Sequence, residues 1–200
     1  NMAAMALKNG YVVVTAGLRS RGSADSQGNY NHSPVTVADA KAVIRYLRYN
    51  DNEIAGDTDK IFISGTSGGG ALSAAIGSNG NSSDFYEELY AIGAAGMSSK
   101  TESTIKDDVF GVVAYCPITD LGHADGSYEF AYAGARQELR KSGYTEESEG
   151  YSLSDSTMAV SPELAAWWAN YVNDLNISDV SASFDTDNLT ASGSLYDTMK

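Results

Sequence analysis

The sequence predicts an α/β fold in which helices flank a parallel β-sheet. Three short runs of β-branched and other apolar residues alternate with stretches in which apolar residues recur at helical spacing. This alternation of strand and helix is typical of a parallel sheet with helices on both of its faces. The pattern stops near residue 120, and we expect two parts: an α/β core over residues 1–120 and a mainly helical segment over residues 121–200.

The elements of the core follow one another in a regular order. The predicted strands are residues 11–16, 60–64 and 109–115, which are rich in Val, Ile, Phe and Tyr. The predicted helices are residues 1–9, 35–49, 71–76 and 85–92. In the helix over residues 35–49, apolar positions share one face, so that Asp39, Lys41, Arg45 and Arg48 are expected to point largely outward.

Residues 121–200 have a different character. Gly, Ser, Tyr, Asp and Glu dominate, and no further β-branched run of strand length appears. One amphipathic helix is predicted over residues 163–175. Ser161 and Pro162 precede it, and a serine N-cap followed by proline at the first helical position is a common way for a helix to begin.

Charge and cysteine content limit the classes of partner. The chain carries 26 acidic and 13 basic residues, a net charge of −13. Nucleic acids and anionic membrane surfaces require clustered Lys and Arg, so we expect neither as a partner. Cys116 is the single cysteine, which excludes an internal disulfide, and its apolar surroundings predict a buried side chain. The chain begins with Asn within a predicted helix, so we expect the natural start to lie upstream, and the cellular compartment stays open.

One short motif carries chemistry. Residues 65–69 read Gly-Thr-Ser-Gly-Gly, a G-x-S-x-G motif with a predicted strand before it and a predicted helix after it. This context is that of the nucleophile elbow of α/β-hydrolases, a strained turn that exposes the serine hydroxyl above the sheet. The motif predicts Ser67 as the nucleophile and the N–H of Gly68 as a donor to the oxyanion. The alternative is a glycine-rich turn in an ordinary strand–helix unit. A phosphate-binding loop is disfavoured because no Lys follows.

A general base and an acid are harder to assign. The order expected for this fold is Ser, then Asp or Glu, then His. His32 precedes Ser67, and His123 follows it by only one predicted strand, whereas the base normally follows the last strand of the sheet. Asp120 either caps a turn or serves as the acid. We expect the base and the acid to lie outside these 200 residues.

Four stretches resemble the bacterial tannases and related feruloyl-esterase-like carboxylesterases. They are KNGYVVVTAG, VADAKAVIRYLRYN, GDTDKIFISGTSGGGALS and VFGVVAYCPITDLGHAD, within residues 6–130. The resemblance implies an α/β-hydrolase core with a lid inserted after the strand at residues 109–115. It also implies that Ser67 is the nucleophile, that Gly68 is an oxyanion donor and that Ile118 lines the acyl pocket. Thr66 and Gly68 stand where fungal relatives place a cysteine, which favours the bacterial branch.

The resulting functional hypothesis is a serine hydrolase that cleaves aromatic, galloyl-type esters. Its partners would be a small-molecule ester and the remainder of the hydrolase polypeptide, without a cofactor or a metal. Three alternatives stay open: a general carboxylesterase or acetylesterase, a peptidase of the prolyl-oligopeptidase type, and a binding scaffold derived from a hydrolase.

Overall fold

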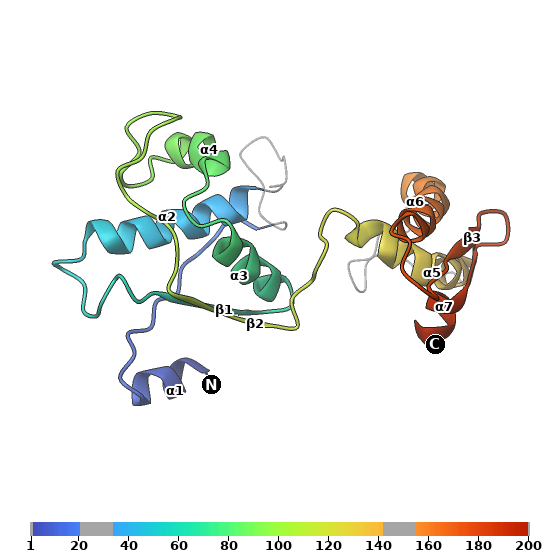
Figure 1. Ribbon diagram of the computed structural model, residues 1–200, viewed down its shortest axis with the longest axis horizontal. Helices are drawn as coiled ribbons and strands as arrows, with labels where there is room; N and C mark the ends of the chain where they lie inside the picture. Colours follow the sequence, from blue (N-terminus) through green and yellow to red (C-terminus); the bar gives the residue numbers. More distant parts are fainter. Residues whose placement is uncertain (1, 21–33, 142–154, 200) are drawn as a thin grey trace. The chain divides into compact units, whose positions relative to one another are not determined.

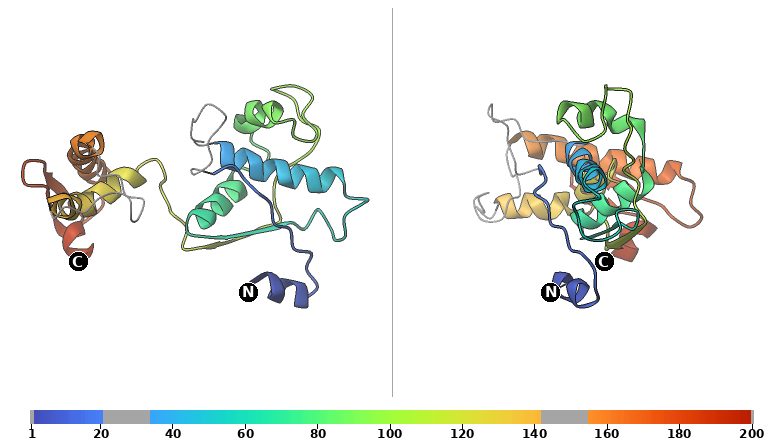
Figure 2. Two further views of the ribbon diagram at one scale, coloured as in Figure 1. Left: turned by 180° about the vertical axis from the view of Figure 1, so that it is seen from behind. Right: turned by 90° about the vertical axis from the view of Figure 1, so that its left-hand side faces the viewer.

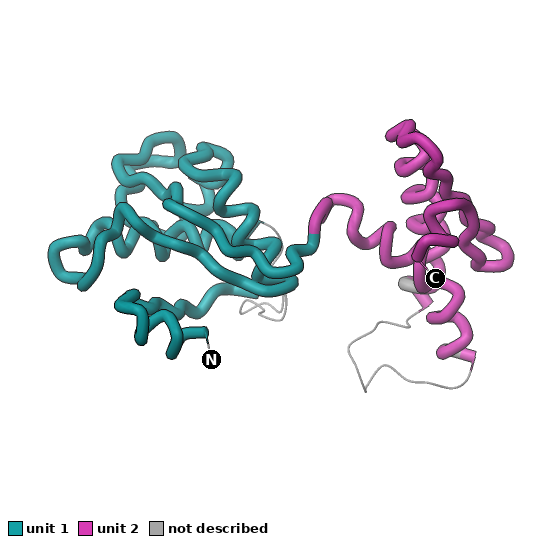
Figure 3. Tube along the Cα trace, turned by 60° about the horizontal axis from the view of Figure 1, so that its bottom comes forward, with its two compact units in different colours: residues 1–118 teal, residues 119–200 magenta. Residues whose placement is uncertain are grey.

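The computed structural model describes residues 2–20, 34–141 and 155–199 of the chain. These residues form two compact units, Asn1–Ile118 (unit 1) and Thr119–Lys200 (unit 2), shown in different colours in Figure 3. Each unit is described by itself below. The division falls two residues before the expected boundary at residue 120. That unit 2 belongs to a lid stays a prediction.

Unit 1 contains a short parallel sheet with helices around it. Its elements are α1 (Met2–Lys8), α2 (Val35–Tyr49), β1 (Phe62–Thr66), α3 (Gly68–Ser78), the 3₁₀ turn η1 (Ser83–Phe85), α4 (Tyr86–Ala91) and β2 (Gly111–Tyr115). Strands β1 and β2 pair in parallel, with Phe62 opposite Gly111 and Thr66 opposite Tyr115. The parallel arrangement predicted for the second and third runs is therefore confirmed.

The first predicted strand is wrong. Residues 11–16 have no regular secondary structure, and the side chains of Val12 and Val14 are 53 % and 50 % exposed. A strand exists only when its backbone groups bond to a neighbouring strand. No strand among the described residues pairs with this segment, so the β-branched composition alone does not make it one.

Helix α3 covers one face of the β1–β2 pair, and α2 and α4 pack beyond it on the same side (Figures 1 and 2). The close approach of α3 to the sheet depends on small residues. A Cβ added at Gly77 would lie 2.6 Å from a methyl group of Val112. Helix α1 lies on the other side of the sheet, where the Ser64 hydroxyl contacts the Met2 sulfur at 3.5 Å. This packing positions the turn between β1 and α3, which carries the G-x-S-x-G motif.

Unit 2 is a helical hairpin with a small sheet against it. Its elements are α5 (Ala124–Lys141), α6 (Asp155–Asp174), β3 (Ser183–Asp185), β4 (Thr190–Ser192) and α7 (Ser194–Met199). The core is centred on the almost fully buried Phe130, and the buried residues packed with it are Ala165, Ala169, Val172 and Ala182. Helix α5 and the antiparallel β3–β4 pair were not predicted, because α5 is rich in Gly, Tyr and charged residues and each strand has only three residues.

Helix α6 does not begin at Ser161 and Pro162, as expected, but six residues earlier, at Asp155. Pro162 lies inside the helix, where it removes one backbone hydrogen bond. Ser161 is 2 % exposed and donates a hydrogen bond of 2.5 Å to Glu129 of α5 instead of capping the helix. Contacts with α5 thus allow α6 to begin before Ser161 and Pro162, the local sequence signal for a helix start. Among the described residues, no helix has the length and apolar character needed to cross a bilayer.

Candidate active site

Ser67 lies at the turn between the carboxyl end of β1 and the first residue of α3. Its backbone angles are φ 57° and ψ −117°, a region that residues other than glycine rarely adopt. The residue is exposed, and its side chain makes no capping hydrogen bond to the helix. Its backbone N–H donates to the carbonyl of Tyr115 on β2 at 3.0 Å. The turn therefore holds Ser67 at the carboxyl end of β1, and the Ser67 hydroxyl makes no capping hydrogen bond to α3.

The glycine two residues before Ser67 is required by the geometry of this turn. A Cβ added at Gly65 would lie 2.2 Å from the carbonyl oxygen of Gly69, closer than any real contact. Gly69 itself would meet nothing within 4 Å. Of the two glycines that flank the serine in the G-x-S-x-G motif, Gly65 is therefore required by sterics in this structure, whereas Gly69 is not.

Gly70 is a residue that the sequence argument missed. It is buried, and an added Cβ would lie 2.6 Å from the carbonyl oxygen of Tyr115 and 3.1 Å from Cα of Pro117. Its lack of a side chain lets the first turn of α3 approach the end of β2. The third consecutive glycine in the sequence was the available signal. Gly68 is the first residue of α3, so its N–H belongs to the helix N-terminus, where backbone donors favour negative charge.

Two residues singled out in the sequence, Cys116 and Ile118, directly follow β2, whose last residue, Tyr115, bonds to Ser67. Cys116 is exposed with φ 35°, so the expectation of a buried thiol is wrong. The reason is its position: it follows the last residue of β2 and begins the turn out of the sheet. Ile118 is 45 % exposed and ends unit 1. The last residue of β2, Tyr115, thus accepts the backbone hydrogen bond of Ser67. Ile118, the residue expected to line the acyl pocket, follows three residues later.

The residues discussed as acid and base fall in different parts of the structure. His32 lies outside the described residues. Asp120 and His123 belong to unit 2, where Nδ1 of His123 is 2.6 Å from Oδ1 of Asp120. Tyr171 of α6 donates its hydroxyl to Oδ2 of the same carboxylate at 3.1 Å. Asp120 therefore closes a turn, which was one of the two roles left open for it.

The contacts of this pair shift the pKa values of Asp120 and Tyr171. The hydrogen bond from His123 lowers the pKa of the Asp120 carboxyl below its ordinary value; slight desolvation opposes this, and the Tyr171 hydroxyl adds to it. The same carboxylate raises the pKa of the Tyr171 phenol. The imidazole of His123 also stacks on two rings of α6. Its centroid lies 3.7 Å from that of Tyr171 and 5.1 Å from that of Trp167.

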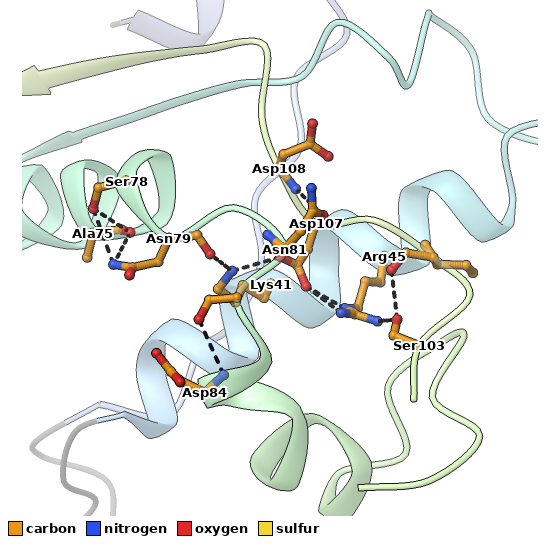
Figure 4. Close-up of polar contacts among 12 residues, drawn as sticks. Lys41, Arg45, Ala75, Ser78, Asn79, Asn81, Asp84, Ser103, Asp107 and Asp108 are labelled. Atoms are coloured by element: carbon orange, nitrogen blue, oxygen red, sulfur yellow. Dashed lines mark hydrogen bonds and ion pairs between the residues drawn. The ribbon is translucent and has the colours of Figure 1, made fainter. Parts of the chain in front are cut away.

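A buried ionic cluster supports the strand that ends beside Ser67. Asp107, four residues before β2, accepts hydrogen bonds of 2.7 Å from both Nζ of Lys41 and Nε of Arg45 (Figure 4). All three side chains are fully buried. The expectation that Lys41 and Arg45 point outward is therefore wrong. The helical pattern of α2 could not indicate that a carboxylate more than sixty residues away would take them into the interior.

The turn after α3 completes the cluster. The backbone N–H of Asn81 donates to Asp107 at 2.9 Å, and the Asn81 side chain accepts from the backbone N–H of Asp107 at 2.8 Å (Figure 4). Nη1 of Arg45 donates to the Ser103 hydroxyl at 2.5 Å. Its Nη2 lies 2.6 Å from Oδ2 of Asp107 as an ion-pair contact without hydrogen-bond geometry. The cluster joins α2, the end of α3 and the start of β2.

A second basic residue of α2 contacts the neighbouring aspartate. Nη1 of Arg48 donates to Asp108 at 2.9 Å, and the Asp108 side chain is about half exposed. Arg45 and Arg48 are the two arginines of the RYLRYN stretch, and Asp107 and Asp108 lead into β2. The RYLRYN stretch is thus bonded to the two residues that directly precede the VFGVVAYCPITDLGHAD stretch. Among the described residues, no group of three or more His, Cys, Asp or Glu side chains could hold a metal ion.

Comparisons with known proteins agree with this geometry. The model of the BD-FAE family matches residues 1–163. A search of curated proteins gives no match. Among solved structures, a tannin acyl hydrolase in complex with ethyl gallate is 36 % identical, with a TM-score of 0.61. The alignment covers 98 % of this chain and 40 % of that one.

Two further bacterial structures are similar to the same degree. The Fusobacterium nucleatum tannase is 36 % identical with a TM-score of 0.61 over 100 % of this chain and 43 % of its own. The native tannin acyl hydrolase from Lactobacillus plantarum is 36 % identical with a TM-score of 0.61 over 98 % of this chain and 41 % of its own. The chain thus spans about two fifths of the length of the tannases that it matches.

These matches extend across both units, beyond residues 6–130, where the resemblance was seen in the sequence. They confirm the predicted α/β-hydrolase fold and the predicted relation to bacterial tannases. The parallel β1–β2 pair is part of the sheet of that fold. The chain belongs to the BD-FAE family of esterase-like α/β-hydrolases.

Proposed function

We propose that this chain is the nucleophile-bearing part of a carboxylic-ester hydrolase, with Ser67 as the residue that is acylated. The observation that carries the proposal is the backbone of Ser67, held at φ 57° and ψ −117° between a strand and a helix. Strained serine residues at this position have their hydroxyl at the top of the sheet, within reach of a substrate. Membership in an esterase-like family supports the same reaction.

The reaction follows from the groups around this turn. The Ser67 hydroxyl attacks the ester carbonyl carbon while a general base removes its proton, and the carbonyl oxygen becomes an oxyanion. The N–H of Gly68, at the positive end of α3, donates to that oxyanion. The C–O bond to the leaving alcohol then breaks, and the proton from the base goes to the alcohol. Water hydrolyses the acyl-serine by the same route, which releases the acid and restores Ser67.

An aromatic acyl group is the proposed substrate class. Two of the similar solved structures are tannin acyl hydrolases in complex with ethyl gallate and with 3,4-dihydroxybenzoate. Ile118 lies three residues after the end of β2, the strand that pairs with β1, and its apolar side chain is exposed. An apolar side chain of this kind suits the face of a phenolic ring. Ile118 is accordingly proposed to line the acyl pocket.

The base and the acid are proposed to come from the remainder of a longer hydrolase polypeptide. The similar tannases are more than twice as long as the aligned region. Large apolar side chains on and beside the sheet of unit 1 are also exposed to solvent, among them Phe62 on β1 at 50 % and Phe110, directly before β2, at 63 % exposure. Soluble proteins normally cover apolar surface of this extent. Further strands of the same polypeptide would cover it.

Active-site labelling tests the nucleophile. In the full-length natural protein, a fluorophosphonate should label Ser67, because only an activated and exposed serine reacts with it. Ser67→Ala should abolish labelling and lower kcat by several orders of magnitude, on the scale of about 10⁶. Ser78→Ala is the matched control, since Ser78 is exposed at the end of α3, where its hydroxyl donates to the Ala75 carbonyl and accepts from the Asn79 side chain. Labelling that persists in Ser67→Ala would refute the assignment.

A substrate panel separates the proposed activity from its alternatives. Methyl gallate, methyl ferulate, p-nitrophenyl acetate and a proline-containing peptide should be compared through kcat/KM. The galloyl ester should give the highest value. Preference for the acetate would favour a general carboxylesterase, and cleavage of the peptide would favour a peptidase. Absence of turnover on all four, with Ser67 unlabelled, would favour a binding scaffold.

A further inference from the structure

The chain that leaves β2 is packed against the first turn of α3. A Cβ added at Gly70 of α3 would lie 3.1 Å from Cα and 3.3 Å from the backbone nitrogen of Pro117. It would also lie 2.6 Å from the carbonyl oxygen of Tyr115, the last residue of β2. Gly70 is buried, and only a residue without a side chain allows other backbone to approach this closely. These residues all belong to unit 1, so their arrangement is that of one compact unit.

The same segment is bonded to the turn that carries Ser67. The Tyr115 carbonyl accepts the backbone N–H of Ser67 at 3.0 Å, and Gly70 follows Ser67 on the first turn of α3. The end of β2 is therefore held at both ends of that turn, by a hydrogen bond and by close packing. Cys116 then adopts φ 35° as the chain leaves the sheet. A left-handed backbone is costly for a residue other than glycine, and it persists only where its surroundings determine it.

Pro117 restricts the chain between this packed turn and Ile118. Its ring holds φ at about −65°, and its backbone nitrogen carries no hydrogen. Ile118 comes directly after it, and consecutive Cα atoms lie about 3.8 Å apart across a trans peptide bond. Ile118 is the last residue of unit 1, and its side chain is 45 % exposed. The position of Ile118 relative to Ser67 thus depends on one restricted residue that is packed against α3.

We infer that Gly70 and Pro117 are positioning residues, whose contact sets where Ile118 lies relative to Ser67 and thereby determines the preference for aromatic over small acyl groups. The inference rests on the proposed function, in which Ile118 lines the acyl pocket. A side chain that is already held in place costs less to order when the substrate binds. An aromatic ring gains from this contact, whereas an acetyl group is too small to depend on it. The expected effect therefore falls on the KM of aromatic esters.

Pro117→Ala is the most selective test, because it frees φ of residue 117 and adds no bulk toward Gly70. In the full-length protein, KM for methyl gallate should rise about three- to tenfold while kcat changes less than about twofold. The kinetic constants for p-nitrophenyl acetate should stay close to those of the parent. Pro34→Ala is the matched control, since Pro34 is also half-buried in unit 1 but directly precedes α2. It should leave both KM values unchanged.

Gly70→Ala tests the other side of the contact. The new methyl group displaces Pro117 and also meets the carbonyl that bonds to Ser67. KM for methyl gallate should therefore rise, and fewer molecules should react with a fluorophosphonate. Because KM does not depend on the number of active molecules, its rise reports the acyl site of those that remain active.

A double-mutant cycle shows whether the effect passes through Ile118. Ile118→Ala alone should raise KM for methyl gallate, because it removes the apolar contact with the ring. Adding Pro117→Ala to Ile118→Ala should change KM little further, since the side chain that Pro117 positions is gone. Two independent effects would instead multiply, and that result would overturn the inference.

Fluorophosphonate labelling of each variant distinguishes a positioning role from misfolding, because it counts the molecules with a functional Ser67. Full labelling of Pro117→Ala with a raised KM for the gallate ester alone supports the inference. An unchanged KM in Pro117→Ala or in Ile118→Ala would overturn it, and so would equal losses on both esters. A parent protein that is neither labelled nor active on any ester would instead refute the proposed function, so the two failures are distinguishable.

Discussion

Ser67 keeps its unusual backbone because its neighbours leave little room for another conformation. Its N–H is bonded to Tyr115 on one side and its carbonyl accepts from Ala71 on the other. Gly65 and Gly70 allow the strand and helix to approach within the space that a single Cβ would fill. Strain at one residue persists only where such surroundings determine it. The reactivity proposed for the serine therefore depends on residues that take no part in the chemistry.

Gly65→Ala should damage both stability and activity. The new methyl group meets the backbone of Gly69 at 2.2 Å, and backbone cannot move aside as a flexible side chain can. We expect the free energy of unfolding to fall by about 1–3 kcal/mol, measured by urea denaturation. Displacement of the elbow by a fraction of an ångström should lower kcat/KM by about 10²-fold. Gly69→Ala, which meets nothing within 4 Å, is the matched control and should lose far less.

Arg19, in the segment before α2, forms an ion pair with Asp39 of α2, with Nη2 of Arg19 2.6 Å from Oδ1 of Asp39. This ion pair should make stability depend on pH. Desolvation raises the pKa of Asp39, but the hydrogen bonds from Arg19 outweigh it, and the folded-state pKa lies below the ordinary value of 3.8. A carboxyl group with a lowered folded pKa stabilises the protein above its unfolded pKa, and this contribution is lost as the pH falls through the folded value. The difference in unfolding free energy between the parent and Asp39→Asn should be largest near neutral pH. It should shrink as the pH is lowered below about 4, and a difference that is independent of pH would contradict the assignment.

At the scale of elements, Asp107 links three segments that are far apart in the sequence. It receives Lys41 and Arg45 from α2 and the backbone of Asn81 from the turn after α3. Strand β2 begins four residues later and ends at Tyr115, the acceptor for Ser67. The cluster thereby fixes the start of β2, the strand whose last residue accepts a hydrogen bond from Ser67.

Asp107→Ala should be strongly destabilising. It leaves two buried cations without their carboxylate, a change that typically costs about 3–5 kcal/mol. Asp108→Ala provides the comparison, because Asp108 pairs with Arg48 while its own side chain is 49 % exposed. Exposed pairs contribute about 0–1 kcal/mol. Guanidinium denaturation of both variants should separate these two values clearly, whereas equal losses would show that the burial of Asp107 does not matter.

The elements differ in how well the sequence predicted them, and the reasons are physical. The helix over residues 35–49 was predicted with its observed bounds because its apolar stripe packs against the core. The burial of Lys41 and Arg45 was not predictable from that helix, since their partner is distant in the chain. Pro162 misled the prediction of α6, because tertiary packing outweighs one lost hydrogen bond. The run at residues 11–16 has the composition of a strand, but no strand among the described residues pairs with it.

The residues of the candidate site differ in the same way: features set by the local sequence were predicted, and features set by distant contacts were not. The strained turn at Ser67 and the need for glycine at position 65 agree with the G-x-S-x-G motif, because such a turn is a local structure whose spacing and glycine content are fixed by sterics. The role of Ser67 as the nucleophile stays a prediction. Gly70 and the Asp120–His123–Tyr171 cluster were not found, since each depends on a contact with a separate element. Local chemistry is visible in a sequence, whereas long-range contacts require the fold.

At the scale of the whole molecule, the proposal makes esterase activity a property of a longer polypeptide. The 200 residues expressed alone should show no turnover of methyl gallate, because the proposed base and acid are outside them. In the full-length protein, His123→Ala should keep kcat within about tenfold of the parent. Removal of a true general base costs about 10⁴–10⁶-fold. A loss of that size in His123→Ala would identify His123 as the base and refute this part of the proposal.

The long sequence separations within the Asp107 cluster also have a consequence for the order of folding. Lys41, Asn81 and Asp107 come together only after two loops, of about 40 and 26 residues, have closed, and loop closure opposes the early formation of such contacts. Helices α2 and α3, whose hydrogen bonds are local, can form first. We therefore expect the register of β2, and with it the strained turn at Ser67, to be established late. If Ser67 is the nucleophile, as proposed, it would become reactive only in molecules that have nearly finished folding, and a partly folded chain would not yet hydrolyse esters.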